Sequence, residues 1–277
     1  MLDPTAETNL QTYDSPEVAR YYASLVYVTP CERLLFDSYI KPESNILDLG
    51  VGGGRTTAYL ASRASRYVGV DYAPAMIKAC QAKFPDLDFR VMDAADLSVF
   101  QKESFDTVVF AFNGIDFVLS AAARRACLEH VHRVLKPNGC LIFSSHNPRA
   151  ILVWRGWNRE RLRRIAGRFS GRSVYLNAML FAGLTSARST IALVQSAWAS
   201  LQRFFKRVVS KTFWLGEGVL ADTAHGGLLT HYWIPARTVD VLTGLHFRIE
   251  RIVGNEYPHP HCVLSTDWYY YVFAKRG

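Results

Sequence analysis

The chain has 277 residues, which is long for one ordinary domain and short for two, so we expect one enlarged domain or a core with an inserted subdomain. Hydrophobic residues make up 49% of the chain and charged residues 20%, a globular composition that excludes wholesale disorder and collagen-like structure. The 32 Lys and Arg against 24 Asp and Glu give a formal net charge of +8, which permits anionic partners but identifies none.

Cysteine usage and the hydropathy pattern indicate a compartment. The five cysteines are scattered, odd in number and never spaced as CxxC, which disfavours a disulfide framework and a structural zinc site. Residues 1–9 show no signal peptide, and no segment reaches the roughly 18 uninterrupted apolar residues of a membrane span. We therefore expect a cytoplasmic protein without a metal site.

Strands and helices alternate along the first half of the chain. The predicted helices lie within 15–40 and at 55–63, 75–84 and 121–135, and the predicted strands at 45–49, 67–70, 88–92, 105–112 and 140–144. After a long interruption, the pattern returns with a helix at 235–243 and strands at 247–253 and 268–274. This alternation predicts an α/β fold, a doubly wound and mostly parallel seven-stranded sheet covered on both faces.

The interruption, residues 149–229, is predicted to be a largely helical insertion after the fifth strand, between core segments 1–148 and 230–277. Its first part is rich in arginine. Its second part predicts a long amphipathic helix with one apolar face, formed by Ile191, Val194, Trp198, Leu201, Phe205 and Val208. The stripe predicts a helix packed on the core, with a helix lying on an acidic membrane or a dimer contact as alternatives. Four glycines between 216 and 227 then indicate a loop.

A glycine-rich segment follows the first predicted strand and opens a helix. Gly50, Gly52 and Gly54 are spaced GxGxG, with Asp48 just before them and Asp71 at the end of the next strand. Glycines at such a turn let the main chain approach a ligand closely. A dinucleotide site would have the spacing GxGxxG, so this loop differs from the usual redox pattern.

These residues resemble the class I S-adenosylmethionine-dependent methyltransferases. The likeness continues in the family's order through residues 67–76, 93–97, 105–109 and 133–141, and it covers roughly residues 10–148 and 230–275. It implies a Rossmann-like methyltransferase fold, with S-adenosyl-L-methionine as cofactor and S-adenosyl-L-homocysteine as product.

The resemblance also implies a role for each residue at the cofactor. Asp71 would accept hydrogen bonds from the ribose hydroxyls, Asp48 would receive the ammonium group, and Asp93 with the Ala94 N–H would bind adenine. The remaining contacts are Gly50, Gly52 and Gly54 at the methionine part, Tyr72 and Met76 at the ribose and adenine edge, Phe110 and Asn113 at the sulfonium and methyl, and Tyr21, with Tyr13 and Tyr22, over the carboxylate. Structural alternatives remain open: a plain tight turn, a helix cap at Asp71, core packing of Met76, and a solvated acid at Asp93.

The implied reaction is displacement by a nucleophile at the methyl carbon of a sulfonium, in which the protein supplies alignment and desolvation. A hydroxyl acceptor also needs a base, and histidine is the natural base near neutral pH. The order of preference is His231, then His225 and His146, with Asp116 as a further candidate. A structural or substrate-orienting role is the alternative for each.

The leading hypothesis is methylation of a small molecule, on a hydroxyl of a sugar or secondary metabolite. The insertion would form an acceptor-binding cap whose arginines hold phosphate or carboxylate groups, and a homodimer is compatible. The net charge suggests methylation of RNA or another polyanion instead, but nucleic acid is disfavoured because no RNA-binding motif is visible and Phe112-Asn113-Gly114-Ile115 replaces the signature for base amino groups. A non-catalytic cofactor-binding protein is a third possibility, and the glycine spacing disfavours a nicotinamide oxidoreductase.

Overall fold

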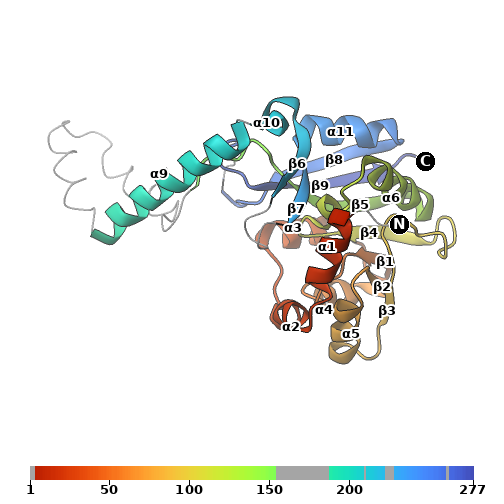
Figure 1. Ribbon diagram of the computed structural model, residues 1–277. Coiled ribbons are helices and arrows are strands. Elements are labelled where there is room, and N and C mark those ends of the chain that lie inside the picture. Colours follow the sequence, from red (N-terminus) through yellow and green to blue (C-terminus); the bar gives the residue numbers. More distant parts are fainter. Residues whose placement is uncertain (1–3, 154–186, 209, 222–227, 260–261) are drawn as a thin grey trace, which may run out of the picture.

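The computed structural model describes residues 4–153, 187–208, 210–221, 228–259 and 262–277 (Figure 1). Seven strands form its main sheet: β1 (Ser44–Leu49), β2 (Ala64–Asp71), β3 (Asp88–Val91), β4 (Phe105–Phe110), β5 (Leu135–His146), β8 (Phe247–Gly254) and β9 (Trp268–Lys275). Their order across the sheet is β3-β2-β1-β4-β5-β9-β8. The strands from β3 to β5 pair in parallel, and β9 runs antiparallel to both β5 and β8. This topology confirms the predicted doubly wound, mostly parallel sheet.

Helices cover both faces of this sheet. They are α3 (Pro30–Tyr39), α4 (Thr57–Ala61) and α5 (Pro74–Lys83) on one face, and α6 (Ala121–Val134) and α11 (Pro235–Gly244) on the other. Alternate side chains of a strand point to opposite faces of the sheet and pack against different helix layers. Leu47 and Leu49 pack with α6, whereas Ile46 packs with α3 and α4. The result is a three-layer α/β/α sandwich, which is the usual arrangement for a mainly parallel sheet.

Two N-terminal helices lie outside the three layers, at the carboxyl end of the strands. They are α1 (Pro4–Tyr13), which was not predicted from the sequence, and α2 (Pro16–Ser24). The Asn9 side chain donates to the Leu229 carbonyl at 3.0 Å, and the Ala75 N–H donates to the Asp14 carboxylate at 2.7 Å. The segment is therefore attached both to α5 and to the chain near residue 229.

The segment predicted as an insertion contains strand as well as helix. Its described elements are the helices α9 (Ala187–Val208) and α10 (Lys211–Leu215) and the strand β6 (Glu217–Ala221), which pairs antiparallel with β7 (Leu229–Trp233). The loop predicted near residues 216–227 is thus partly a hairpin, and the boundary expected between 229 and 230 falls inside β7. The arginine-rich part, apart from Arg149, lies outside the described residues.

Helix α9 differs most from expectation. It extends away from the body of the protein (Figure 1), and its apolar stripe is exposed, with Val194 and Trp198 each 62% accessible. The expectation that this stripe packs on the core was therefore wrong.

Candidate functional site

A cavity of about 380 Å³ opens where the strand order reverses, at the carboxyl ends of β1, β2 and β4. Ligands of open α/β sheets bind at this kind of switch point. Of the predicted cofactor contacts, nine line the cavity: Asp48, Gly50, Gly52, Asp71, Tyr72, Met76, Asp93, Ala94 and Phe110. The sheet therefore gathers residues that are far apart in the sequence around one space.

The glycine loop forms one wall of the cavity, and its glycines have different roles. Gly50 and Gly52 have φ values of 60° and 54°, in the left-handed region that favours glycine, and a Cβ on Gly50 would lie 2.8 Å from the Phe110 ring. Gly54 does not line the cavity, because it faces Phe84 on the side of α5. Gly53 does line it, and a Cβ there would lie 2.3 Å from the main chain at Tyr22. Gly53 thus allows α2 to pack directly on the loop.

Asp71, the last residue of β2, is buried beside this loop. Its carboxylate accepts hydrogen bonds from the Gly52 N–H at 2.9 Å and the Ala73 N–H at 3.0 Å. Burial raises the pKa of Asp71 to about 6, although these main-chain donors oppose the shift. A carboxylate has about four lone-pair sites, so Asp71 retains acceptor capacity toward the cavity.

Asp48, in β1, is a second buried carboxylate on the cavity wall. The Tyr67 hydroxyl donates to it at 2.8 Å, and Tyr67 also lies 2.9 Å from the Thr57 hydroxyl. Burial raises the pKa of Asp48 to about 7 against the effect of the Tyr67 hydrogen bond. A cationic ligand group in the cavity would favour the ionised form of this carboxyl.

Aromatic side chains close the cavity on the side of the N-terminal helices. The Tyr13 ring contacts Tyr22, Tyr72 and Phe117 edge to face, at centroid distances of 5.9, 6.5 and 5.3 Å, and all four residues line the cavity. The Tyr72 hydroxyl is buried with no hydrogen-bond partner among the described residues. Tyr21, which was predicted to close the cavity, is 63% exposed and does not line it, so Tyr22 takes that position.

The adenine end of the expected site is more open. Asp93 and Ala94 both line the cavity, and the Asp93 carboxylate accepts a hydrogen bond from the Ala95 N–H at 2.8 Å. This contact holds the loop after β3 in a local turn. Met76 is buried in the core and also lines the cavity, so the two predicted positions for it coincide.

An ion pair beside the loop was not predicted from the sequence. The Arg55 guanidinium binds the buried Glu32 carboxylate in a bidentate pair and stacks on the rings of Tyr27 and Phe112, each at 4.8 Å. Tyr270 also donates to Glu32, at 3.2 Å. A sequence signal existed, because Glu32 belongs to a Thr-Pro-Cys-Glu helix start and Arg55 stands where a dinucleotide loop would have its third glycine.

His146, at the end of β5, forms a polar network with Asp116. Its Nδ1 lies 2.7 Å from Asp116 Oδ2, and its main-chain N–H donates to the same oxygen at 2.7 Å. The Ser145 hydroxyl donates to Asp116 Oδ1 at 2.7 Å, and Asn113 Nδ2 lies 3.2 Å from His146 Nε2. Burial raises the pKa of Asp116, and the hydrogen bonds from His146 act against this. A proton on Nδ1 satisfies Asp116 and leaves a lone pair on Nε2.

This network lies next to the cavity rather than on its wall. Neither His146 nor Asn113 lines the cavity, but Phe112 and Gly114, on either side of Asn113, do. Asn113 has a φ of 65° and its N–H donates to the Ser144 hydroxyl at 2.7 Å. The turn after β4 therefore connects the cavity to His146.

The two other candidate bases are placed differently. His231, in β7, is buried against the Trp233 ring at 4.8 Å and does not line the cavity. Burial, with a smaller effect of Arg124, lowers the pKa of His231 to about 3, so it is a weak proton acceptor. His225 lies outside the described residues. The first choice from the sequence is thus poorly placed to act as a base.

Two other properties of the described residues bear on the chemistry. None of the helices described is both long and apolar enough to span a membrane. Within the same ranges, no three His, Cys, Asp or Glu side chains gather into a possible metal site.

Comparison with known proteins gives a family match. The model of a methyltransferase domain matches residues 46–139. A demethylmenaquinone methyltransferase of Paenarthrobacter aurescens is 29% identical over 133 residues, which are 48% of this chain and 51% of the relative. A carboxy-S-adenosyl-L-methionine synthase of Vibrio parahaemolyticus is 33% identical over 119 residues, 40% of this chain and 47% of the relative. The chain thus spans about half the length of these curated relatives.

Solved structures show the same fold at low sequence identity. A 1,6-didemethyltoxoflavin N1-methyltransferase of Burkholderia thailandensis, solved with bound 1,6-didemethyltoxoflavin and S-adenosylhomocysteine, has a TM-score of 0.57 at 14% identity, covering 100% of this chain and 92% of that one. An S-adenosylmethionine-dependent methyltransferase of Methanosarcina mazei has a TM-score of 0.54 at 18% identity, covering 91% and 99%. Residues 46–139 thus match a methyltransferase domain, and the chain has the fold of S-adenosylmethionine-dependent methyltransferases.

Proposed function

We propose that this protein transfers the methyl group of S-adenosylmethionine to a hydroxyl group of a small-molecule acceptor. The observation that carries the proposal is the cavity itself, where Asp71 after β2 and the glycine loop after β1 face one space at the sheet's switch point. The family match and the methyltransferases among its relatives support the same chemistry.

The residues of the cavity fit the proposed cofactor. Asp71 would accept hydrogen bonds from the ribose hydroxyls with the lone pairs that Gly52 and Ala73 leave free, and Asp48 would face the ammonium group. The buried Tyr72 hydroxyl, with no partner among the residues described, offers a further polar contact. When bound, S-adenosylmethionine supplies an activated methyl group that an acceptor oxygen can attack.

The acceptor would lie beyond Phe110 and Ala111, and His146 would serve it as a base. The hydroxyl proton would go to His146 Nε2. The acceptor hydroxyl would then take the place of the Asn113 amide, which contacts Nε2 in the structure. Asp116 would hold the imidazole in orientation and stabilise the charge that it gains. His146 is therefore the preferred base in place of His231.

The remaining expectations stay proposals. Residues 149–229, apart from α9, which extends away from the body of the protein, would form a cap over the acceptor. All five cysteines are free, which agrees with the proposed cytoplasmic location. Methylation of nucleic acid would instead show as binding that weakens steeply with salt.

Replacing Asp71 tests the cofactor site. We expect Asp71→Ala to weaken binding of S-adenosylhomocysteine by about 3 kcal/mol or more, because two hydrogen bonds to a charged acceptor are lost. Titration calorimetry measures the change, and Asp71→Asn separates the loss of charge from the loss of volume. Asp96→Ala is the matched control, since Asp96 is an exposed loop acid off the cavity. Unchanged affinity of Asp71→Ala would contradict the proposed site.

Replacing His146 tests the base. We expect His146→Ala to lower kcat with hydroxyl acceptors by about 10²–10⁴-fold, while cofactor affinity stays the same. Methyl transfer from labelled cofactor to a panel of hydroxyl compounds and their amine analogues measures this effect. Neutral amines need no base for the attack, so their rates should fall far less.

Two further variants complete this test. Asp116→Asn should shift the pH profile of kcat, whereas a purely structural role of Asp116 would lower activity equally at each pH. His246→Asn is the control, because His246 is exposed and off the cavity. Full activity of His146→Ala with hydroxyl acceptors would show that the base lies elsewhere.

A further inference from the structure

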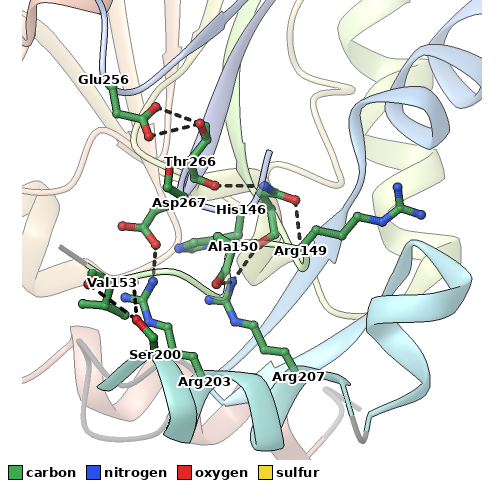
Figure 2. Close-up of polar contacts among 12 residues, drawn as sticks. His146, Arg149, Ala150, Val153, Ser200, Arg203, Arg207, Glu256, Thr266 and Asp267 are labelled. Atoms are coloured by element: carbon green, nitrogen blue, oxygen red, sulfur yellow. Dashed lines mark hydrogen bonds and ion pairs between the residues drawn. The ribbon is translucent and has the colours of Figure 1, made fainter. Parts of the chain in front are cut away.

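The helix α9 is attached to the body of the protein through its polar face. Figure 2 shows Arg207 reaching from α9 toward Ala150, in the segment that follows β5, and Arg203 reaching toward Asp267, just before β9. Arg207 donates to the carbonyls of Asn147 and Ala150 at 2.8 and 2.7 Å, and Arg203 forms an ion pair with Asp267. Arg203 and Arg207 thus bind the protein itself, and the Lys206 ammonium also donates to the Ala221 carbonyl at 3.0 Å.

Serines on the same face extend this attachment. The Val153 N–H donates to the Ser200 hydroxyl at 2.8 Å, as Figure 2 also shows. One turn earlier, Ser196 is 4% exposed. Successive residues of a helix turn by about 100°, so these serines lie on the face that carries Arg203 and Arg207. The face of α9 that contacts the body is therefore polar.

The opposite face of α9 is apolar and accessible. Its large side chains are more than 40% exposed, and they are Ile191, Val194, Trp198, Leu201 and Phe205, with Phe204 at the border of this face. The short helix α10, which follows α9 in the chain, exposes two further large apolar side chains, Trp214 at 68% and Leu215 at 69%. A helix on a globular protein normally turns its apolar face inward, so α9 shows the reverse orientation. An apolar patch of this kind marks an interaction surface.

The charge of this region favours one partner over the others. The sequences of α9 and α10 contain five basic residues and no Asp or Glu. Lys206 and Lys211 are exposed, and Lys206 lies about 100° from Phe205, at the border of the apolar stripe. A second copy packed on α9 would bring like charges together without a carboxylate from either helix to pair with them. An acidic lipid surface would accept both the apolar side chains and the cations.

We propose that the apolar face of α9 docks on the surface of an anionic membrane, with the exposed Trp214 and Leu215 of α10 as further apolar contacts. The helix lies in the interface with Trp198 and Phe205 among the acyl chains and Lys206 at the level of the headgroups. Attachment through the opposite face fixes the protein to this helix. The inference does not depend on the proposed methyl transfer.

Vesicle cosedimentation of the full chain tests the proposal. We expect the protein to bind vesicles containing phosphatidylglycerol more tightly than vesicles of phosphatidylcholine alone, and to bind less tightly as salt rises. The double variant Trp198→Ser/Phe205→Ser should lower the partition coefficient by about tenfold or more, because two apolar anchors are lost. Val99→Ser is the matched control, since Val99 is an apolar residue with similar exposure far from α9 in the sequence.

A second pair of changes and a measurement in solution complete the design. Ile191→Ser/Val194→Ser should also weaken binding, and unchanged thermal melting of each variant shows that its fold is intact. Failure of the wild type to bind anionic vesicles, or undiminished binding by both double variants, overturns the proposal. A dimer in sedimentation equilibrium that Trp198→Ser/Phe205→Ser dissociates, without vesicle binding by the wild type, assigns this face to a second copy instead.

Discussion

Two carboxyl groups in the cavity titrate close to neutral pH because the fold buries both of them. The pKa of Asp48 is about 7 and that of Asp71 about 6, each raised above 3.8 mainly by burial. The free protein therefore holds protons on these groups at pH 5. The proposed ligand carries an ammonium group and two ribose hydroxyls, which bind an ionised carboxylate better than a protonated carboxyl. Below these pKa values, binding must therefore release protons from Asp48 and Asp71.

Cofactor affinity should consequently rise with pH. We expect the affinity for S-adenosylhomocysteine to be highest above pH 7 and to fall below it, by up to about tenfold for each pH unit and each group that must ionise. Titration calorimetry in two buffers with different ionisation enthalpies counts the protons released. Asp48→Asn should flatten the upper part of this dependence. An affinity that stays the same from pH 5.5 to pH 8 would argue against ionisation of either group on binding.

The sequence predicted the residues whose roles depend on short local motifs. Asp48, Gly50, Gly52 and Asp71 are close in number to the strand ends that position them, and all four line the cavity. The pair formed by Arg55 and Glu32 was missed because Arg55 lies in the turn before α4 and Glu32 in α3, and only tertiary packing brings them together. His146 was ranked below His231 for the same reason, since burial of a histidine in a hairpin has no signature in sequence.

At the scale of elements, the alternating core was predictable and the additions to it were not. The strands β1, β2, β4 and β5 each contain a hydrophobic run of ordinary strand length, and turn residues separate these runs. The strand β5 begins earlier than predicted, at Leu135, because Pro137-Asn138-Gly139 forms an irregularity within the pairing to β4 instead of a loop before it. The hairpin of β6 and β7 was missed because glycines occur both in β-hairpins and in open loops, and their presence in the sequence does not distinguish the two.

The helix α9 shows a limit of periodicity. The spacing of its apolar residues correctly predicted a helix, but periodicity does not reveal which face contacts the body. Here Arg203 and Arg207 find a carboxylate and main-chain carbonyls at the end of β5, so the polar side is the one that docks. The orientation of α9 depends both on its own faces and on the surface of the body that it contacts, and only the structure shows the second of these.

At the scale of the whole molecule, the cavity lies between two separately built parts. The sheet contributes the glycine loop and Asp71, while the N-terminal helices contribute Tyr13 and Tyr22 from above. A ligand in this space contacts both parts and binds only the folded chain. Ligand binding should therefore stabilise the entire fold rather than a single loop.

The stabilisation has a size that calorimetry can check. At about 100 times its Kd, S-adenosylhomocysteine should stabilise the folded chain by about 2.7 kcal/mol. For a chain of this length the increase in Tm should be about 5–10 °C. Differential scanning calorimetry measures the shift, and Asp71→Ala should abolish most of it at the same ligand concentration. NAD is the comparison ligand. Loops that bind NAD favour a third glycine at the position that Arg55 occupies here, so we expect NAD to leave Tm unchanged. An equal shift with NAD would mean that the cavity accepts a redox dinucleotide, and the proposed cofactor would then have to be abandoned.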